Sequence, residues 1–356
     1  MATRSADKII DSLAHITRQT DRELLEASLA STLYDMLHLK RVALYKVFYE
    51  HNQPVFYLSV EIIEDKAYIS DAHKMLTPAA EKEVDNLIDC QAKRYMTSCS
   101  SGNNSQYLYP VLNKQRVVVS VFSLEGNEPH CEEEEKFIAG YFQIYSNYLR
   151  LLDESEHDTL TGLLNRRTFD SNLGKLLAQW HRDHDIPMRG NQVPQRRHES
   201  VEKSNWLAVI DIDLFKRVND QFGHLYGDEV LLLMANIMRE SFRGYDKLFR
   251  FGGEEFVVIL RNTDQEGAIK ALERFRTSVE TYQFPQTGKV TVSIGYVGIG
   301  TQAVPSEVLS YADEALYYVK QHGRNQTCQY EALVKEGKLT PSQKKISCLN
   351  AEVFDK

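Results

Sequence analysis

The sequence predicts an α+β fold in two parts, and the C-terminal part is predicted to be ferredoxin-like. With 356 residues, the chain is long enough to bury two hydrophobic cores. Residues 206–213 form an apolar run that ends in acidic residues, a pattern typical of a buried central strand. Gly252 and Gly253 separate two apolar runs, which predicts a β-hairpin because glycine adopts positive φ without steric cost.

The composition is that of an ordinary soluble globular protein, with 42% hydrophobic and 26% charged residues. A net charge of −8 argues against a general nucleic-acid binder, which would present a basic face. No apolar run approaches the roughly 20 residues of a membrane span, and the N-terminus lacks a signal-peptide pattern. We therefore expect a cytoplasmic location. The five scattered cysteines favour free thiols over a structural disulfide.

The first 130 residues predict an α/β domain. Apolar residues recur at helical spacing within residues 5–38, which indicates two amphipathic helices. A further helix is expected over residues 81–96, and the polar pair Asn113-Lys114 predicts a hairpin turn. The strand-like runs cover residues 41–49, 54–62, 106–111 and 115–122.

This order of helices, strands and a late hairpin resembles a GAF-type sensory domain. The resemblance implies a small ligand, whose identity is unknown, or a role in dimerisation. Five aromatic side chains could line a pocket for such a ligand, although packing in the core is the favoured interpretation. They are Tyr45, Phe48, Tyr49, Phe56 and Tyr57.

A linker helix is predicted over residues 131–157. Its apolar residues recur in steps of three and four, the spacing of a coiled-coil seam. They are Ile138, Tyr141, Tyr145, Tyr148 and Leu152. We expect this seam to pair with a second copy of the chain. The alternative is a single amphipathic helix that lies on the first domain.

The C-terminal domain is predicted over residues 158–330, and a polar, flexible tail over residues 331–356. A polar insertion over residues 181–204 separates the first helix of the domain from its first long strand. His181 and His184, together with Asp183 and Asp185, could bind a metal in this insertion, but a solvated loop is favoured. The remaining predicted elements are helices up to residue 242, strands 247–251 and 256–260, helix 265–282, strand 289–295 and helix 306–322.

Acidic residues are expected to converge at one edge of the predicted sheet. Asp211 and Asp213 are two positions apart, so both project to one face if the strand continues that far. Glu254 and Glu255 lie on the neighbouring hairpin, which brings up to four carboxylates together. Such a density of negative charge requires a divalent cation, and oxygen-only ligands favour Mg²⁺.

Residues 158–167 and the Gly252–Phe256 motif resemble the diguanylate cyclase domains that are named for the sequence Gly-Gly-Asp/Glu-Glu-Phe. The resemblance covers residues 158 to about 330. It implies a nucleotidyl-cyclase palm fold and the condensation of two GTP into cyclic di-GMP and two pyrophosphates. It also implies a homodimer, because each domain would hold one GTP.

The resemblance further implies two Mg²⁺ ions per active site, with Mn²⁺ as a possible substitute. Asp211, Glu254 and the backbone carbonyl of Ile212 would bind the metal, and Glu255 would contribute less directly. Glu254 would also help to deprotonate the attacking hydroxyl. Lys216 would neutralise triphosphate charge, although an exposed helix lysine is the ordinary interpretation of such a residue.

For the substrate, the resemblance places Asn219 and Asp228 at the guanine edge, with His224 and Phe215 in the same pocket. A carboxylate accepts the paired N–H donors of guanine, which favours GTP over ATP. Two residues of the last helix would hold the β- and γ-phosphates, namely Lys320 and Arg324. As cations near the C-terminus of a helix, both would be favourable without a ligand too.

Arg243 and Asp246 match an Arg-x-x-Asp inhibitory site that binds cyclic di-GMP in many such enzymes. Arg243 could contact the phosphate and guanine of the product, and Asp246 could accept guanine N–H bonds. A catalytically silent receptor for GTP or cyclic di-GMP is the alternative function. A different purine cyclase or a mixed-dinucleotide synthase is a third hypothesis, which Asp228 disfavours.

Overall fold

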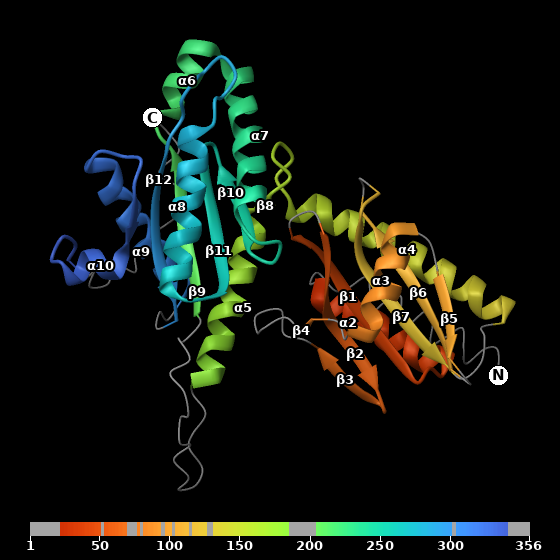
Figure 1. The fold of residues 1–356 in the computed structure, drawn as a ribbon. Helices are drawn as coiled ribbons and strands as arrows, with labels where there is room; N and C mark the ends of the chain where they lie inside the picture. The colour runs from red at the N-terminus through yellow and green to blue at the C-terminus, as the bar shows by residue number, and fades with distance from the viewer. Residues whose placement is uncertain are drawn as a thin grey trace, which may run out of the picture. The chain divides into compact units, whose positions relative to one another are not determined.

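The structure of the chain is a computed structural model (Figure 1). It describes residues 22–50, 53–69, 77–78, 81–93, 97–101, 104–113, 116–126, 131–184, 204–300 and 304–340. Most of the predicted first helix and of the 181–204 insertion therefore lie outside the described residues. Within them, no helix combines the length and apolar character that a membrane crossing requires.

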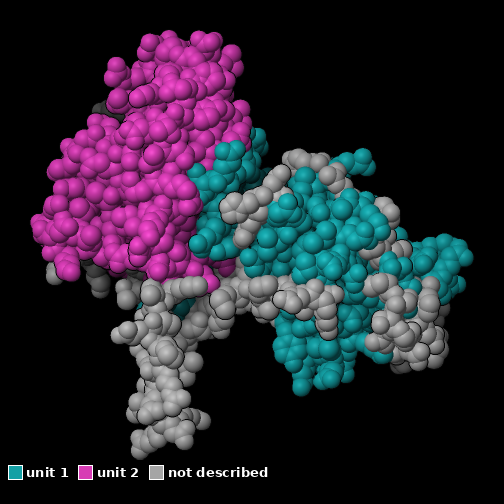
Figure 2. All heavy atoms as spheres, viewed as in Figure 1, with its two compact units in different colours: residues 1–195, 238–250 teal, residues 196–237, 251–356 magenta. Residues whose placement is uncertain are grey.

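The chain divides into two compact units (Figure 2). One contains residues 1–195 and 238–250, and the other contains residues 196–237 and 251–356. Domain boundaries at residues 130, 157 and 330 stay predictions. Three cysteines are free thiols in the described regions, as expected: Cys90, Cys131 and Cys328.

The N-terminal strands form a seven-stranded sheet in the order β3-β2-β1-β7-β6-β5, and β4 pairs with β2. The recorded strand pairs in this sheet are antiparallel. The predicted strands and the 81–96 helix are confirmed, with ends that shift by a few residues. The elements are α2 (Arg22–Leu37), β1 (Arg41–Glu50), β2 (Gln53–Ile63), β3 (Lys66–Ile69), β4 (Thr77–Pro78), α3 (Glu81–Lys93), β5 (Thr97–Ser101), β6 (Asn104–Leu112) and β7 (Val118–Gly126).

Each face of this sheet contributes to a hydrophobic core. Val42 and Leu44 of β1 belong to a cluster with residues of α2 and α4 (Glu132–Glu156). Ala43 and Tyr45 belong to a second cluster, which includes Leu87 of α3. The alternation follows from the two-residue period of a strand. Of the five aromatic residues considered for a ligand pocket, Tyr45 and Phe56 are buried in the second cluster.

The aromatic seam of the linker helix packs inside the chain's own N-terminal core. Helix α4 forms as predicted, but Ile138, Tyr141, Tyr145 and Leu152 are buried against α2 and the sheet. Tyr148 packs against the same cluster. This packing supports the alternative of an amphipathic helix on the first domain. The residues that were expected to pair with a second copy are already used in the core.

The segment after α4 is fixed by hydrogen bonds to the Asp158 carboxylate. The backbone N–H and hydroxyl of Thr161 donate to Asp158 Oδ1 at 2.8 and 2.6 Å, and Arg250 Nη1 donates at 3.0 Å. Although burial opposes ionisation, these bonds lower the pKa of Asp158. Short strand β8 (Leu164–Asn165) then pairs in parallel with the strand that carries Arg250.

The C-terminal sheet has six strands in the order β13-β12-β9-β11-β10-β8. Strand β9 (Ser204–Ile212) is central, and it pairs antiparallel with β11 (Glu255–Thr263) and β12 (Val292–Ile299). The strand and helix order confirms the predicted α+β fold of this part. The other elements are α5 (Arg166–His184), α6 (Phe215–Phe222), α7 (His224–Ser241), β10 (Lys247–Gly252), α8 (Gln265–Thr281), α9 (Pro305–Gln321), β13 (Thr327–Gln329) and α10 (Tyr330–Lys335).

The start of the predicted flexible tail instead forms α10, at the end of β13. Tyr330 stacks on Tyr311 of α9 with ring centroids 4.4 Å apart, and Leu333 is buried. Glu331 Oε1 accepts a hydrogen bond from the backbone of Gly298 at 2.9 Å. A six-residue helix has too few turns for its apolar period to stand out in the sequence.

Replacement of Ile138 by alanine should destabilise the N-terminal unit by about 2–5 kcal/mol, because the truncation opens a cavity in a packed core. Ile144 of the same helix is 39% exposed, so Ile144→Ala is the matched control and should cost no more than about 0.5 kcal/mol. Urea unfolding of both variants measures the difference. The packing would be contradicted if Ile138→Ala left the free energy of unfolding unchanged while Ile144→Ala lowered it.

Candidate functional site

The pairing of β9 with β11 brings acidic residues together at the end of the central strand. Asp211 lies directly opposite Glu255 in this register. The backbone N–H of Ile212 faces the carbonyl oxygen of Glu254 at 3.4 Å. Opposite residues in an antiparallel pair project to the same face, with Cβ atoms about 4.5–5.5 Å apart. The sheet therefore places Asp211 and Glu255 on the same face, and Glu254 is near enough for the charge of Asp211 to act on it.

The turn that precedes these glutamates depends on its two glycines. Strands β10 and β11 are neighbours in the sheet, and only Gly253 and Glu254 connect them. Gly252 has a φ of 141° and Gly253 has a φ of 52°, a region that other residues adopt at a steric cost. The predicted glycine turn is thus present, and it places Glu254 at the tip, beside the end of β9.

Burial and mutual repulsion disfavour the charged forms of the acids at this site. Burial raises the pKa of Asp211, and the charges of Glu255 and Asp213 add to the rise, while Lys320 opposes it. Burial also raises the pKa of Glu254, with a further contribution from Asp211. Asp211 is 5% exposed, and its Oδ2 lies 2.7 Å from Nζ of Lys320.

The charge balance at the site fits a divalent cation. When ionised, Asp211, Glu254 and Glu255 carry three negative charges, and the Lys320 ammonium neutralises one of them. Oxygen ligands from carboxylates and backbone carbonyls are those that Mg²⁺ prefers. The carboxylates of Asp211 and Glu254, the carbonyl of Ile212 and, less directly, Glu255 are therefore the groups that could hold such an ion.

The fourth expected carboxylate, Asp213, does not join this set. Strand β9 ends at Ile212, so the two-residue alternation does not extend to Asp213. Its carboxylate instead accepts hydrogen bonds from Thr291 and Ser293, at 2.7 and 2.6 Å. Of the up to four carboxylates expected here, Asp213 is therefore the one whose oxygens are occupied by hydroxyl donors, although its charge still acts on Asp211.

Helices α6 and α7 carry the residues expected to contact the base and phosphates. Lys216 lies in the first turn of α6 with an exposed side chain, whereas Phe215 is buried beneath it. Asn219 is partly buried near the end of α6. His224 and Asp228 are exposed and one turn apart on α7, so they share a face.

Gly227 packs against two of the expected site residues, Asn219 and Phe215, and the sequence alone did not single it out. A Cβ atom on Gly227 would lie 2.0 Å from Oδ1 of Asn219 and 3.2 Å from Cζ of Phe215. Any side chain at this position would displace the Asn219 carboxamide. The signal was a glycine inside a helix, which usually has a packing or functional reason.

The two cations near the end of α9 have different surroundings. Lys320 is bound to Asp211, so it contacts the acidic set and not only solvent. Arg324 follows the helix, in a turn, and is exposed. Of the expected pair, one residue therefore contacts an acidic residue and the other is exposed beyond the end of α9.

Arg243 and Asp246 form a tight turn between α7 and β10. Asp246 is buried, and its Oδ2 accepts a hydrogen bond from the Arg243 backbone N–H at 3.0 Å. The Arg243 guanidinium is exposed and donates to the Tyr245 hydroxyl at 2.9 Å. The two residues therefore lie together, as the inhibitory-site prediction requires. One N–H donor of the Arg243 guanidinium is already bonded to the Tyr245 hydroxyl.

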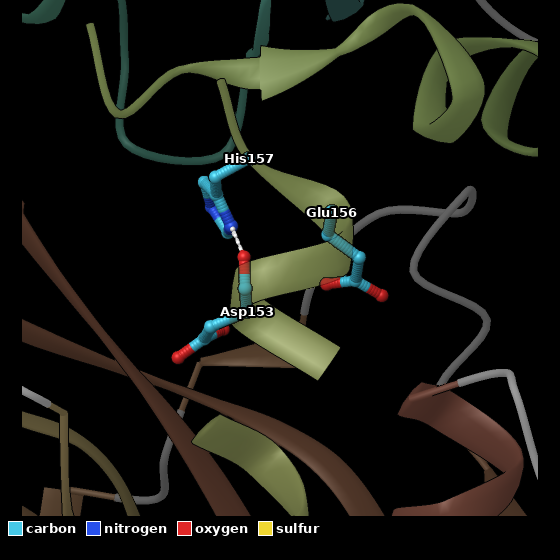
Figure 3. A group of neighbouring side chains, drawn as sticks. All are labelled: Asp153, Glu156 and His157. Carbon is cyan, nitrogen blue, oxygen red and sulfur yellow. Dashed lines mark hydrogen bonds between the residues drawn. The ribbon is translucent and has the colours of Figure 1, made fainter. Parts of the chain in front are cut away.

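Another acidic group lies at the end of α4 (Figure 3). In the part of the chain that the structure describes, Asp153, Glu156 and His157 are the one group of three acid, histidine or cysteine residues with ligand atoms within 4.8 Å of one another. Arg22 pairs with both carboxylates, and His157 Nδ1 lies 2.9 Å from the Asp153 carbonyl oxygen. Because these charges are already paired, we assign no metal here.

Comparison with known proteins identifies the domain that carries the site. Residues 191–326 match the family model "Diguanylate cyclase, GGDEF domain". Over these residues the chain is similar to a GGDEF domain. The match includes the acidic cluster, the glycine turn and α9, and it leaves the N-terminal sheet outside. The resemblance of that sheet to GAF domains stays a prediction.

Curated relatives are similar over the same part of the chain. Diguanylate cyclase DgcP of Pseudomonas aeruginosa is 39% identical over 171 residues, which cover 47% of this chain and 23% of the relative. DgcM of Escherichia coli is 36% identical over 171 residues, which cover 48% and 37%. A crystal structure of the diguanylate cyclase SiaD with its activator SiaC from Pseudomonas aeruginosa is 33% identical, with a TM-score of 0.44 and coverage of 55% and 71%. This chain therefore spans less than half the length of the two curated relatives.

Glu254→Gln should raise the unfolding temperature of the C-terminal part of the chain at pH 7 in metal-free buffer. The folded state raises the pKa of Glu254 above its ordinary value of 4.5, so the ionised side chain destabilises the fold. This cost grows as the pH rises through the folded pKa, and it is absent below about pH 4.5, where both states are protonated. The gain should therefore disappear near pH 4.

Thermal unfolding in EDTA at the two pH values measures this gain. Glu266→Gln, at an exposed pair on α8, is the control and should show no gain that depends on pH in this way. A lower unfolding temperature for Glu254→Gln at pH 7 would contradict the electrostatic account of the site.

Proposed function

We propose that the protein is a diguanylate cyclase that condenses two GTP into cyclic di-GMP and two pyrophosphates. The observation that carries the proposal is the set of acidic residues at the end of β9 and around the start of β11, of which Asp211 is buried, within the part of the chain that matches the GGDEF family model. The 3′-hydroxyl oxygen of each GTP would bond to the α-phosphorus of the other. The bond to the β-phosphate breaks, pyrophosphate leaves, and the hydroxyl proton passes to a base or to solvent.

The acidic cluster would hold two Mg²⁺ ions, and Mn²⁺ suits the same oxygen donors. Asp211, Glu254 and the Ile212 carbonyl are the proposed ligands, with Glu255 in support. Bound metal would neutralise triphosphate charge and make the 3′-hydroxyl more acidic. Glu254 is suited to accept the hydroxyl proton, since its raised pKa lies closer to neutrality than that of an ordinary glutamate.

The remaining residues would position the nucleotide. At the guanine edge Asp228 would accept hydrogen bonds and Asn219 would accept or donate them, with His224 beside them and Phe215 as buried support. Lys216 is exposed where its ammonium could meet the triphosphate. Lys320 and Arg324 would hold the β- and γ-phosphates. Positioning of this kind, together with charge neutralisation, supplies most of the rate acceleration in phosphoryl transfer.

Because one domain would hold one GTP, the reaction needs two copies of the chain face to face. The proposal therefore includes a homodimer and a regulatory role for the N-terminal unit, whose ligand is unidentified. A receptor without activity is less well supported, since Asp211, Glu254 and Lys216, whose loss would favour it, are all present.

Incubation of the purified chain with Mg²⁺ and GTP should yield cyclic di-GMP, resolved by chromatography, and ATP should yield no cyclic product. Glu254→Gln should lower the rate by about 10²–10⁴-fold while folding is retained, because it removes a metal ligand and a base. Glu266→Gln is the control and should leave the rate unchanged. Absence of cyclic di-GMP from a demonstrated dimer would refute the cyclase proposal.

Product inhibition is a separate part of the proposal, and it is assigned to Arg243 and Asp246. Arg243→Ala should raise the concentration of cyclic di-GMP needed for half-inhibition by about tenfold or more, because hydrogen bonds to the product phosphates are lost. Initial rates at increasing product concentration test this. The control is Lys247→Ala, which removes a cation one residue beyond the turn. Arg239→Ala would be a poorer control, because Arg239 donates a hydrogen bond to Thr161 and its loss would disturb the fold. Unaltered inhibition in Arg243→Ala would remove the site from the proposal.

A further inference from the structure

The turn that carries Arg324 has an unusual backbone. Gly323, Arg324 and Asn325 have φ values of 112°, 61° and 46°, so three successive residues lie in the left-handed region. Glycine adopts this conformation freely, but arginine does so at a steric cost. Such a conformation persists only where the surrounding structure imposes it.

Hydrogen bonds to Asn325 hold this turn in its conformation. Its backbone N–H donates to Asp213 Oδ2 at 3.1 Å, and its side-chain Nδ2 donates to Glu280 Oε1 at 3.0 Å. Arg276 Nη1 donates to the Asn325 side-chain oxygen at 2.8 Å. The backbone N–H and both ends of the carboxamide are therefore bonded, and the end of α9 is tied to β9 and α8.

The groups that hold Asn325 are themselves fixed. Asp213 also accepts hydrogen bonds from Thr291 and Ser293, which anchors its carboxylate to the start of β12. Arg276 pairs with Glu280 at 2.8 Å through the same nitrogen that contacts Asn325. A planar guanidinium held in this way offers little freedom to the residue it contacts.

We propose that Asp213, Arg276 and Glu280 are positioning residues that act through Asn325 to set the direction of the Arg324 guanidinium. The inference rests on the proposed function in one respect, namely that Arg324 binds the β- and γ-phosphates. The three residues touch no substrate. Their effect is on recognition of the phosphate chain and not on recognition of guanine, because Asn219 and Asp228 lie on other helices.

The test measures binding of 3′-deoxy-GTP and 3′-deoxy-GMP with Mg²⁺ by calorimetry, since neither analogue has the hydroxyl that would react. Asn325→Ala and Glu280→Ala should each weaken 3′-deoxy-GTP binding by about tenfold, the effect of one hydrogen bond to a charged group. Binding of 3′-deoxy-GMP should stay within about twofold, which also shows that the variants are folded. Glu280→Gln keeps an acceptor for Asn325 and should restore binding, and Glu266→Gln is the control.

A double-mutant cycle with Arg324→Ala separates positioning from an independent contact. If Asn325 acts through Arg324, Asn325→Ala should add nothing to the loss caused by Arg324→Ala. The proposal would be overturned if the losses of affinity in the double mutant multiplied. It would also be overturned if both analogues lost affinity equally, or if the wild type bound the triphosphate no better than the monophosphate. Production of cyclic di-GMP is measured separately from binding of the analogues. If the chain made no cyclic di-GMP but gave the expected binding results, the cyclase proposal would fail and the positioning proposal would stand.

Discussion

The pairing register between β9 and β11 is the constraint on which the candidate site depends. Because side chains alternate between the faces of a strand, a slip of one residue would turn Asp211 away from Glu255 and towards the other face. The register is enforced by apolar residues such as Ile210 and Phe256, which are fully buried opposite each other. The hydrophobic core therefore holds like charges together at its edge, and Lys320 offsets only part of the repulsion.

Much of this arrangement could be predicted from local sequence patterns. The apolar run that leads to Asp211 and the glycines at 252 and 253 are short-range signals, and the structure agrees with both. The role of Asp213 could not be predicted, because its partners Thr291 and Asn325 are about 80 and 110 positions away. The close approach of Gly227 to Asn219 likewise depends on how two helices meet and not on either helix alone.

The linker helix shows why periodicity does not identify a partner. The steps of three and four from Ile138 to Leu152 mark one apolar face of a helix, and this face must be buried. A sheet of the same chain can bury it as well as the matching helix of a second copy can. In the structure the cover is α2 and the N-terminal sheet. The aromatic residues on this face suit such a role, since Tyr141 stacks on Phe137 and Tyr145 packs edge-on against Phe122.

The bond between Asp158 and Arg250 joins two points that are 92 residues apart along the chain. One end lies two residues beyond the last residue of α4, and the other lies two residues before the first glycine of the turn that presents Glu254. The ion pair thus connects the exit of the linker helix to the strand that leads to the acidic residues. If α4 changed direction, either β10 would have to turn with it or the bond between Asp158 and Arg250, an ionic hydrogen bond of low exposure, would lengthen or break.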